Sequence, residues 1–171
     1  NTTGHRNTAA GTDALLSNTT GAYNSAFGQD SMGLNTTGNH NTALGRATLY
    51  TNSTGSNNTA IGYNALNANQ TANDNVAIGY RTLVANTTGI RNVGVGNSAL
   101  GAITTESNCT AVGYKALNAT TEGNLTAVGA YALDANTTGD NCVAVGYAAL
   151  TANTTGHSNV ALGKSALAAN T

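Results

Sequence analysis

The amino-acid sequence predicts an all-β fold, namely a repetitive β-solenoid of about ten coils of 17 residues each. Three observations lead to this prediction. A single motif recurs from one end of the chain to the other, and its period is too short for helix-pair repeats, which need roughly 33 residues or more. Each unit also contains a short β-type run that ends at a glycine.

The repeat is most visible at 136–152, where NTTGDNCVAVGYAALTA is followed by the related NTTGHSNVALGKSALAA. The consensus is N-T-T-G-x-x-N-[TV]-A-[IVL]-G-x-x-A-L-x-A. The eighth unit, 120–135, is one residue shorter and lacks the leading asparagine, and residues 170–171 open an eleventh unit. The ten units start at 1, 18, 35, 52, 69, 86, 103, 120, 136 and 153. Residues 1–171 are therefore predicted to form a single solenoid array.

The elements within a unit follow in a fixed order. The opening Asn-Thr-Thr-Gly has the residue types of a turn. The run NTAIG at 58–62 alternates β-branched or aliphatic residues with a small one and predicts a strand. ALNA at 65–68 predicts a second short strand or a bend. Coils of this kind stack about 4.8 Å apart, so ten of them would form a rod on the order of 50 Å long.

Four positions of the unit behave as columns along the rod. Position 11 is glycine in all ten units, which predicts a corner that needs a positive φ or has no room for a Cβ atom. Position 15 is leucine except for Met32, and position 10 is apolar throughout, so both are expected to form the core. Position 9 is alanine except for Gly94, as expected where two walls approach closely. Because a 17-residue coil encloses little, the thin core favours stacking, bundling or trimerisation.

The run NTAIGYNAL and its copies, through Asn7, Ala9, Gly11 and their equivalents, resemble the head repeat of YadA-like trimeric autotransporter adhesins. Similar runs occur in phage tail-fibre shafts. The resemblance covers all ten units and implies a trimeric, left-handed β-roll. The unit departs from that family in its length, because the family's head unit is typically shorter and does not account for the NTTG turn.

Composition excludes several function classes. Charged residues make up 8% of the chain, against roughly a quarter in ordinary soluble domains, and the net charge is −1. We therefore expect no nucleic-acid partner, and without an 18-residue apolar run we expect no membrane insertion by this segment. The three histidines and seven acidic residues are scattered, and no catalytic or phosphate-binding motif occurs. We expect no enzyme activity, no cofactor and no metal site.

Every unit contains or borders an Asn-x-Ser/Thr pattern, the acceptor signal for N-glycosylation. Glycan on each coil would explain how a chain with so few charges stays in solution. The candidate acceptors are Asn1, Asn18, Asn35, Asn52, Asn57, Asn69, Asn86, Asn108, Asn118, Asn124, Asn136 and Asn153. The alternative is structural, because stacked asparagine and threonine side chains also form hydrogen-bonded ladders in solenoids.

Two further side-chain types are candidates for a role. Tyr63, Tyr80, Tyr114 and Tyr147 share position 12, where an aromatic ladder would bind sugars or neighbouring fibres, or would pack at a lateral contact. The two cysteines share position 7. Cys109 and Cys142 lie two coils apart, about 10 Å, which exceeds the limit of ~7 Å between the Cα atoms of a disulfide. We expect no intrachain disulfide and two small buried side chains.

Three functions remain open. The first is a structural and adhesive fibre on a cell or virion surface or free outside the cell, built from copies of the chain as a lateral trimer or an end-to-end polymer. The second is a module that binds surface glycans or a host receptor through the tyrosine and asparagine columns. The third is ice binding through a threonine file at position 3. That file is Thr3, Thr20, Thr37, Thr54, Thr71, Thr88, Thr105, Thr121, Thr138 and Thr155.

Overall fold

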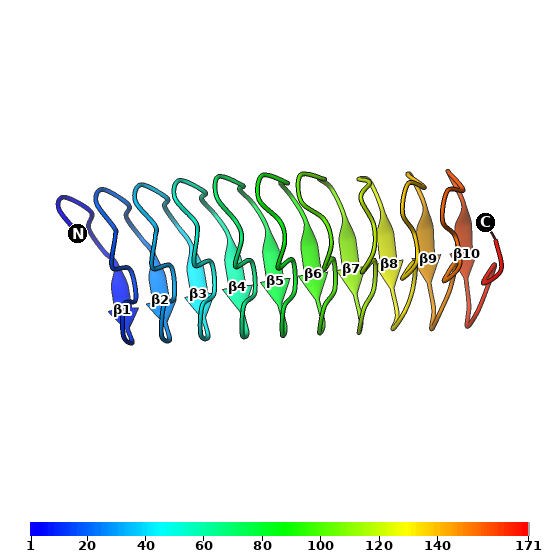
Figure 1. Ribbon diagram of the computed structural model, residues 1–171, viewed down its shortest axis with the longest axis horizontal. Helices are drawn as coiled ribbons and strands as arrows, with labels where there is room; N and C mark the ends of the chain where they lie inside the picture. The colour runs from blue at the N-terminus through cyan, green and yellow to red at the C-terminus, as the bar shows by residue number, and fades with distance from the viewer. Residues whose placement is uncertain (171) are drawn as a thin grey trace.

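The computed structural model describes residues 1–170 and shows a parallel β-solenoid with the predicted period. Each coil contributes one strand of three residues, and the strands pair in chain order into a single ten-stranded sheet (Figure 1). The strands are β1 (Thr8–Ala10), β2 (Ser25–Phe27), β3 (Thr42–Leu44), β4 (Thr59–Ile61), β5 (Val76–Ile78), β6 (Val93–Val95), β7 (Thr110–Val112), β8 (Thr126–Val128), β9 (Val143–Val145) and β10 (Val160–Leu162).

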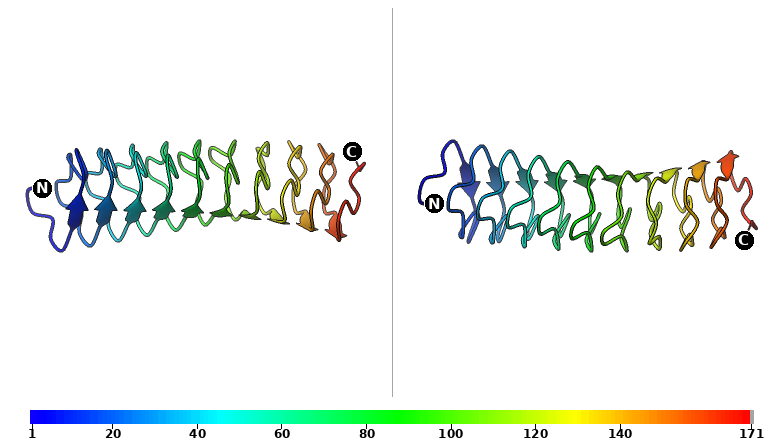
Figure 2. Two further views of the ribbon diagram at one scale, coloured as in Figure 1. Left: turned by 90° about the horizontal axis from the view of Figure 1, so that it is seen from below. Right: turned by 90° about the horizontal axis from the view of Figure 1, so that it is seen from above.

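The coils form a rod with the sheet along one wall and irregular turns around the rest of each coil (Figure 1). The N-terminus and residue 170 lie at opposite ends. Figure 2 shows that the strands turn gradually about the rod axis from β1 to β10, as the usual twist of a sheet requires. The pairing is in register, so equivalent residues of successive units lie side by side, as Ala60 and Ala77 do.

The interior of the rod is lined by position 15, as the sequence predicts for the core, and by position 9, which the sequence predicts to lie where two walls approach closely. The central residue of every strand from β2 to β10 is buried, and so is the position-15 side chain of every coil from Leu15 to Leu150. Buried alanines at position 14, such as Ala65 and Ala99, join these two positions in a single thin core.

The prediction that position 10 lies in the core is wrong. Successive side chains of a strand point to opposite faces, so an inward alanine at position 9 places positions 8 and 10 outside. Phe27 is 41% exposed, Leu44 50% and Ile78 37%. The large apolar residues of the strands therefore face away from the chain's own core.

The glycine at position 11 occupies the corner that the sequence predicts. Its φ lies between 120° and 139° in all ten coils, a backbone conformation that side chains disfavour. A Cβ atom on Gly62 would also lie 2.6 Å from the carbonyl oxygen of Gly79 in the next coil. Glycine is required here by both the backbone angle and the close stacking.

Three non-glycine residues per coil, at positions 6, 13 and 15, adopt the left-handed conformation with φ between 48° and 62°. Such a residue costs about 1–3 kcal/mol and persists where its surroundings fix it. Here the backbone N–H of each bonds to a neighbouring coil: Asn57 donates to Asn39, Asn64 to Arg46, and Leu66 to Thr82. Stacking therefore stabilises the sharp bends that close a coil within 17 residues.

A column of buried asparagines at position 1 links successive coils. The Nδ2 group of each donates to the Oδ1 atom of the asparagine one coil earlier, over 2.7 to 3.3 Å from Asn18 to Asn86. It also donates to the backbone carbonyl three residues later in its own coil. Each side chain thus satisfies its neighbour and its own turn together.

A second asparagine column, at position 7 from Asn7 to Asn92, joins the same coils. The Nδ2 group donates to the position-4 carbonyl of the next coil, as from Asn41 to Gly55 at 2.8 Å. The Oδ1 atom accepts the N–H of position 7 in the next coil, as from Asn58 at 2.9 Å. Threonine hydroxyls at position 2 add a third link, as from Thr36 to the carbonyl of Ser53 at 2.9 Å.

The ladders are interrupted around the seventh and eighth coils. Ile103 replaces the position-1 asparagine, so the Oδ1 atom of Asn86 is buried without a hydrogen-bond partner. In the eighth coil Thr120 stands in the asparagine column and accepts the Nδ2 group of Asn136 at 3.2 Å. Thr121 lies in the position-2 column, where its hydroxyl donates to Thr137. The assignment of Thr121 to the position-3 file is therefore wrong, and the residue missing from this coil is the one at position 3.

The glycine corner yields a test that separates steric clash from backbone strain. Gly62 and Gly163 both have φ 120°, but a Cβ atom on Gly163 would meet nothing within 4 Å. We expect Gly62→Ala to lower the free energy of unfolding by about 1–3 kcal/mol more than Gly163→Ala. Chemical denaturation followed by circular dichroism measures both, and equal effects would contradict the stacking argument.

The asparagine ladder predicts unequal costs for the same substitution. In Asn52→Leu, the Oδ1 atom of Asn35 loses its donor and the Nδ2 group of Asn69 loses its acceptor. Asn86→Leu leaves one ladder partner unpaired, the Oδ1 atom of Asn69, because the Oδ1 atom of Asn86 serves no partner. Both variants also remove the donor to a turn carbonyl, so that loss is the same in each. We expect Asn52→Leu to lower the free energy of unfolding by about 1 kcal/mol more than Asn86→Leu does, as measured by chemical denaturation followed by circular dichroism. A larger cost at Asn86 would contradict the ladder.

Candidate functional site

The outer face of the sheet carries a row of large apolar side chains. We call the outward side chains at position 10 the apolar stripe, and they come from one strand each along the whole sheet. The stripe consists of Phe27, Leu44, Ile61, Ile78, Val95, Val112, Val128, Val145 and Leu162. Position 8 lies beside it with threonine, serine or valine. Six of these nine side chains are exposed and three, Ile61, Val95 and Val145, are half-buried, and a row of exposed apolar side chains is a feature of interaction surfaces.

The four predicted tyrosines do not form one ladder. Tyr63 and Tyr80 stack with ring centroids 5.5 Å apart, and the Arg46 guanidinium lies over Tyr63 at 5.6 Å. Because Arg46 and Tyr80 are both packed against Tyr63, its ring faces are occupied and are not free platforms for a sugar. Asn97 occupies position 12 of the next coil and separates this stack from the tyrosines that follow.

Sequence reasoning missed two further clusters of aromatic side chains. Tyr131, at position 13 of the short coil, joins the two remaining predicted tyrosines through edge contacts at 5.2 Å to Tyr114 and 6.0 Å to Tyr147. Near the N-terminus Tyr23 stacks on His40 at 4.7 Å and meets His5 edge-on at 5.3 Å. These contacts could have been predicted from the repeat, because aromatic residues at the same or adjacent positions of neighbouring units lie close together.

The structure divides the candidate glycosylation sites into two groups. Seven are buried in the position-1 column, namely Asn18, Asn35, Asn52, Asn69, Asn86, Asn136 and Asn153. A glycan on Nδ2 would remove a ladder hydrogen bond and place a sugar inside the rod, so their burial and pairing weigh against a glycan there in the folded chain. The structural alternative holds for this column. The other five, Asn1, Asn57, Asn108, Asn118 and Asn124, are exposed or half-buried and stay predictions.

The two cysteines are buried and carry free thiols, in coils on either side of the one that contains Leu125. They take the place of position-7 asparagines, and the Sγ atom of Cys142 lies 3.3 Å from the Gly156 carbonyl that an asparagine amide would otherwise contact. Burial raises the pKa of the Cys109 thiol to about 11. This thiol is therefore protonated at neutral pH and unreactive.

The threonine file at position 3 is exposed in nine coils and interrupted in the eighth. Because the rod twists along its length, the file does not lie in one plane (Figure 2). An ice-binding surface requires a flat, regular array, so both features weigh against the ice-binding hypothesis.

Charged groups are sparse and mostly isolated. Within residues 1–170 the single ion pair joins His157 Nδ1 to Asp140 Oδ1 at 2.6 Å, with both side chains exposed. In the same range no three His, Cys, Asp or Glu side chains gather as a metal site, and no helix is long and apolar enough to cross a membrane.

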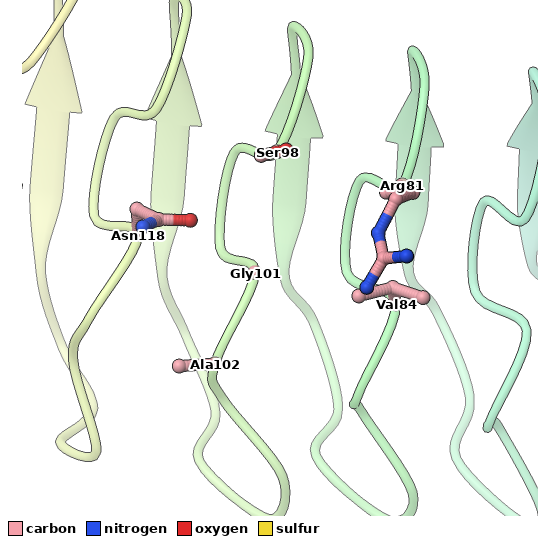
Figure 3. A pocket seen from close by; sticks show the side chains of 6 residues that line it. All are labelled: Arg81, Val84, Ser98, Gly101, Ala102 and Asn118. Carbon is pink, nitrogen blue, oxygen red and sulfur yellow. The ribbon is translucent and has the colours of Figure 1, made fainter.

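One hollow opens on the turn segments of the fifth to seventh coils (Figure 3). It has a volume of about 240 Å³ and is lined by Arg81, Val84, Ser98, Gly101, Ala102 and Asn118. Beside it, burial raises the pKa of the Asp134 carboxyl above its ordinary value, although Lys115 and Asn118 act in the opposite direction.

No family model, curated protein or solved structure matches this chain. The likeness to adhesin heads and tail-fibre shafts therefore rests on the repeat motif, and the structure adds the β-solenoid architecture to it.

The division of the acceptor sites predicts a glycan map. If the chain is secreted from a glycosylating eukaryotic host, we expect glycans at the exposed corner asparagines Asn57, Asn108 and Asn124 and none at the seven buried asparagines of the position-1 column. Mass spectrometry of peptides after enzymatic deglycosylation measures occupancy. Thr59→Ala, which destroys one acceptor signal, should remove one glycan. A glycan on Asn52 or Asn69 of folded chain would contradict the assignment.

Proposed function

We propose that the chain is a non-enzymatic structural subunit of an extracellular fibre, whose copies associate side by side through the apolar stripe. The observation that supports this proposal is the stripe itself. Its large side chains face outward while the inward strand position holds alanine, so the chain leaves its bulkiest strand residues without a partner of its own.

The energetics explain why such a surface needs many coils. Burying the exposed part of one stripe residue contributes about 0.5–1 kcal/mol, because full burial of a Val, Leu, Ile or Phe side chain contributes about 1.5–3 kcal/mol. Association costs about 4 kcal/mol or more in lost freedom of motion. A few coils would not overcome that cost, whereas a stripe along the whole rod does.

A second copy of the rod is the partner that fits this surface best. Its stripe repeats at the same coil spacing, so two or three parallel rods place apolar residues against each other along their full length. The near absence of charge supports the same arrangement, because six basic and seven acidic residues produce little repulsion between copies.

Two features taken together support an extracellular setting. The repeat motif resembles those of adhesin heads and tail-fibre shafts, and the exposed acceptor asparagines would carry solubilising sugars where such a pathway exists. We place the fibre outside the cell, on a cell or virion surface or free. A role in binding surface glycans or a host receptor is the alternative, and the hollow on the turn segments is the feature that favours it.

Sedimentation velocity tests the proposal. We expect the wild-type chain to form dimers or trimers at micromolar concentration, and Ile78→Lys/Val112→Lys to sediment as the 17.0 kDa monomer, because two charges interrupt the stripe. Thr88→Lys is the matched control, since Thr88 is exposed but lies off the sheet. A wild-type chain that stays monomeric, or a double variant that assembles normally, would overturn the proposal.

A further inference from the structure

The hollow in Figure 3 arises because one coil departs from the pattern of its neighbours. At position 16, Val84 and Asn118 flank Gly101, and at position 13, Arg81 and Lys115 flank Ser98. The sixth coil therefore carries small side chains where the fifth and seventh carry larger ones. We call this hollow the sixth-coil notch, defined by the six residues that line it.

The notch is more than the lack of a side chain at one glycine. Gly33 occupies the same position 16 in the second coil, but a Cβ atom there would lie 3.0 Å from the Tyr50 ring, which covers it. At Gly101 the corresponding neighbour is Asn118, whose Oδ1 atom lies 2.7 Å from the Cβ position. A large apolar ring covers Gly33, whereas a short polar side chain borders an open space at Gly101.

The electrostatic character of the notch is positive and largely unbalanced. Arg81 forms no ion pair within the described chain, where the His157–Asp140 pair is the one present. Lys115 lies two coils beyond Arg81, about 10 Å away along the rod. Its ammonium group contacts the Tyr114 ring at 5.7 Å. Asp134 is the acidic group on this side, and it interacts with Lys115 and Asn118 rather than with Arg81.

The remaining polar groups accept hydrogen bonds. The Ser98 hydroxyl donates its proton to Asn97 Oδ1 at 2.8 Å, which leaves the oxygen lone pairs free. Asn118 presents its Oδ1 atom over Gly101. Together, Val84 and Ala102 supply a small apolar part of the lining. The notch thus combines one guanidinium, two acceptors and an apolar wall, which suit an acid group attached to a hydroxyl-bearing frame.

We propose that the sixth-coil notch binds an acidic sugar, with the Arg81 guanidinium holding its carboxylate and Ser98 and Asn118 accepting its hydroxyl protons. A guanidinium binds a carboxylate through two parallel hydrogen bonds, which fixes orientation as well as charge. A volume of about 240 Å³ is below that of drug-sized sites, so a single sugar residue is the expected occupant. The proposal does not rest on lateral assembly, because the notch lies on the turns and not on the sheet.

Titration of galacturonate into the ¹⁵N-labelled chain, followed by NMR shifts, tests the site. We expect shifts confined to the fifth to seventh coils. Arg81→Gln should weaken binding about tenfold or more, since it removes a charge-assisted pair. Arg91→Gln is the matched control, because it removes an equal charge elsewhere and should leave the affinity unchanged.

A steric variant tests the shape of the notch independently of its charge. Gly101→Val places there the side chain that the preceding coil carries at Val84, and its Cβ atom would lie 2.7 Å from the movable Oδ1 atom of Asn118 and 3.3 Å from the backbone carbonyl oxygen of Ser98. It should abolish the shifts while circular dichroism stays unchanged. Asp134→Asn should strengthen binding a few-fold, because it removes the nearby negative charge.

Two further probes identify what is recognised. Galactose binding as tightly as galacturonate would overturn the role of Arg81, and acetate binding as tightly would overturn the role of the hydroxyl acceptors. No shifts with galacturonate, or equal binding by Gly101→Val, would overturn the site itself. Ile78→Lys/Val112→Lys should bind galacturonate as the wild type does, so failure of the fibre proposal and failure of the site give different results.

Discussion

The fold depends on one interaction, the stacking of each buried asparagine on its equivalent in the next coil. A primary amide carries both donors and acceptors, so identical side chains satisfy one another when they lie one strand spacing apart. Asn35, Asn52 and Asn69 form such a series, and each also closes its own NTTG turn. Because the partner of an asparagine is another asparagine one unit away, a shift in register would leave buried amides unpaired. The period of the sequence and the pitch of the rod are therefore fixed together.

This arrangement inverts the usual distribution of side chains at two places, beside an interior that still holds an apolar core of alanine and leucine. Polar amides occupy the inside of the coil, where they are hydrogen-bonded, while the strands present valine, isoleucine and leucine outward. The inversion follows from size, because a coil closed in 17 residues has room for alanine opposite Leu66 but not for Ile61. The apolar outer face is therefore a consequence of the narrow coil. Because burying apolar surface is favourable, association with another copy removes this face from contact with water.

Much of the architecture could be predicted from the sequence, and the errors have physical causes. The period, the Gly62 corner and the Leu66 column were predicted correctly because glycine and leucine recur at one position in register. Position 10 was misassigned because alternation shows that Ile61 and Ala60 face opposite ways but not which of them faces inward. The asparagine acceptor motifs were ambiguous for a similar reason, since burial depends on how the turn folds. The notch was not predicted, because it depends on what is absent at Gly101.

The repeat also explains where specific recognition belongs. Features that recur in every coil, such as the stripe, give contacts that add along the rod and favour a partner of the same period. A ligand of single-residue size needs a place that occurs once, and this is found where the pattern fails. The sixth to ninth coils contain most of these failures, including Gly101, Ile103 and the shortened eighth coil. They are tolerated one rung at a time: Ile103 leaves a single amide oxygen, Asn86 Oδ1, buried without a partner, while Leu125 stays buried between Cys109 and Cys142. The residues that recur in every coil thus build the scaffold, and the proposed sugar site lies where the recurring pattern is broken at Gly101.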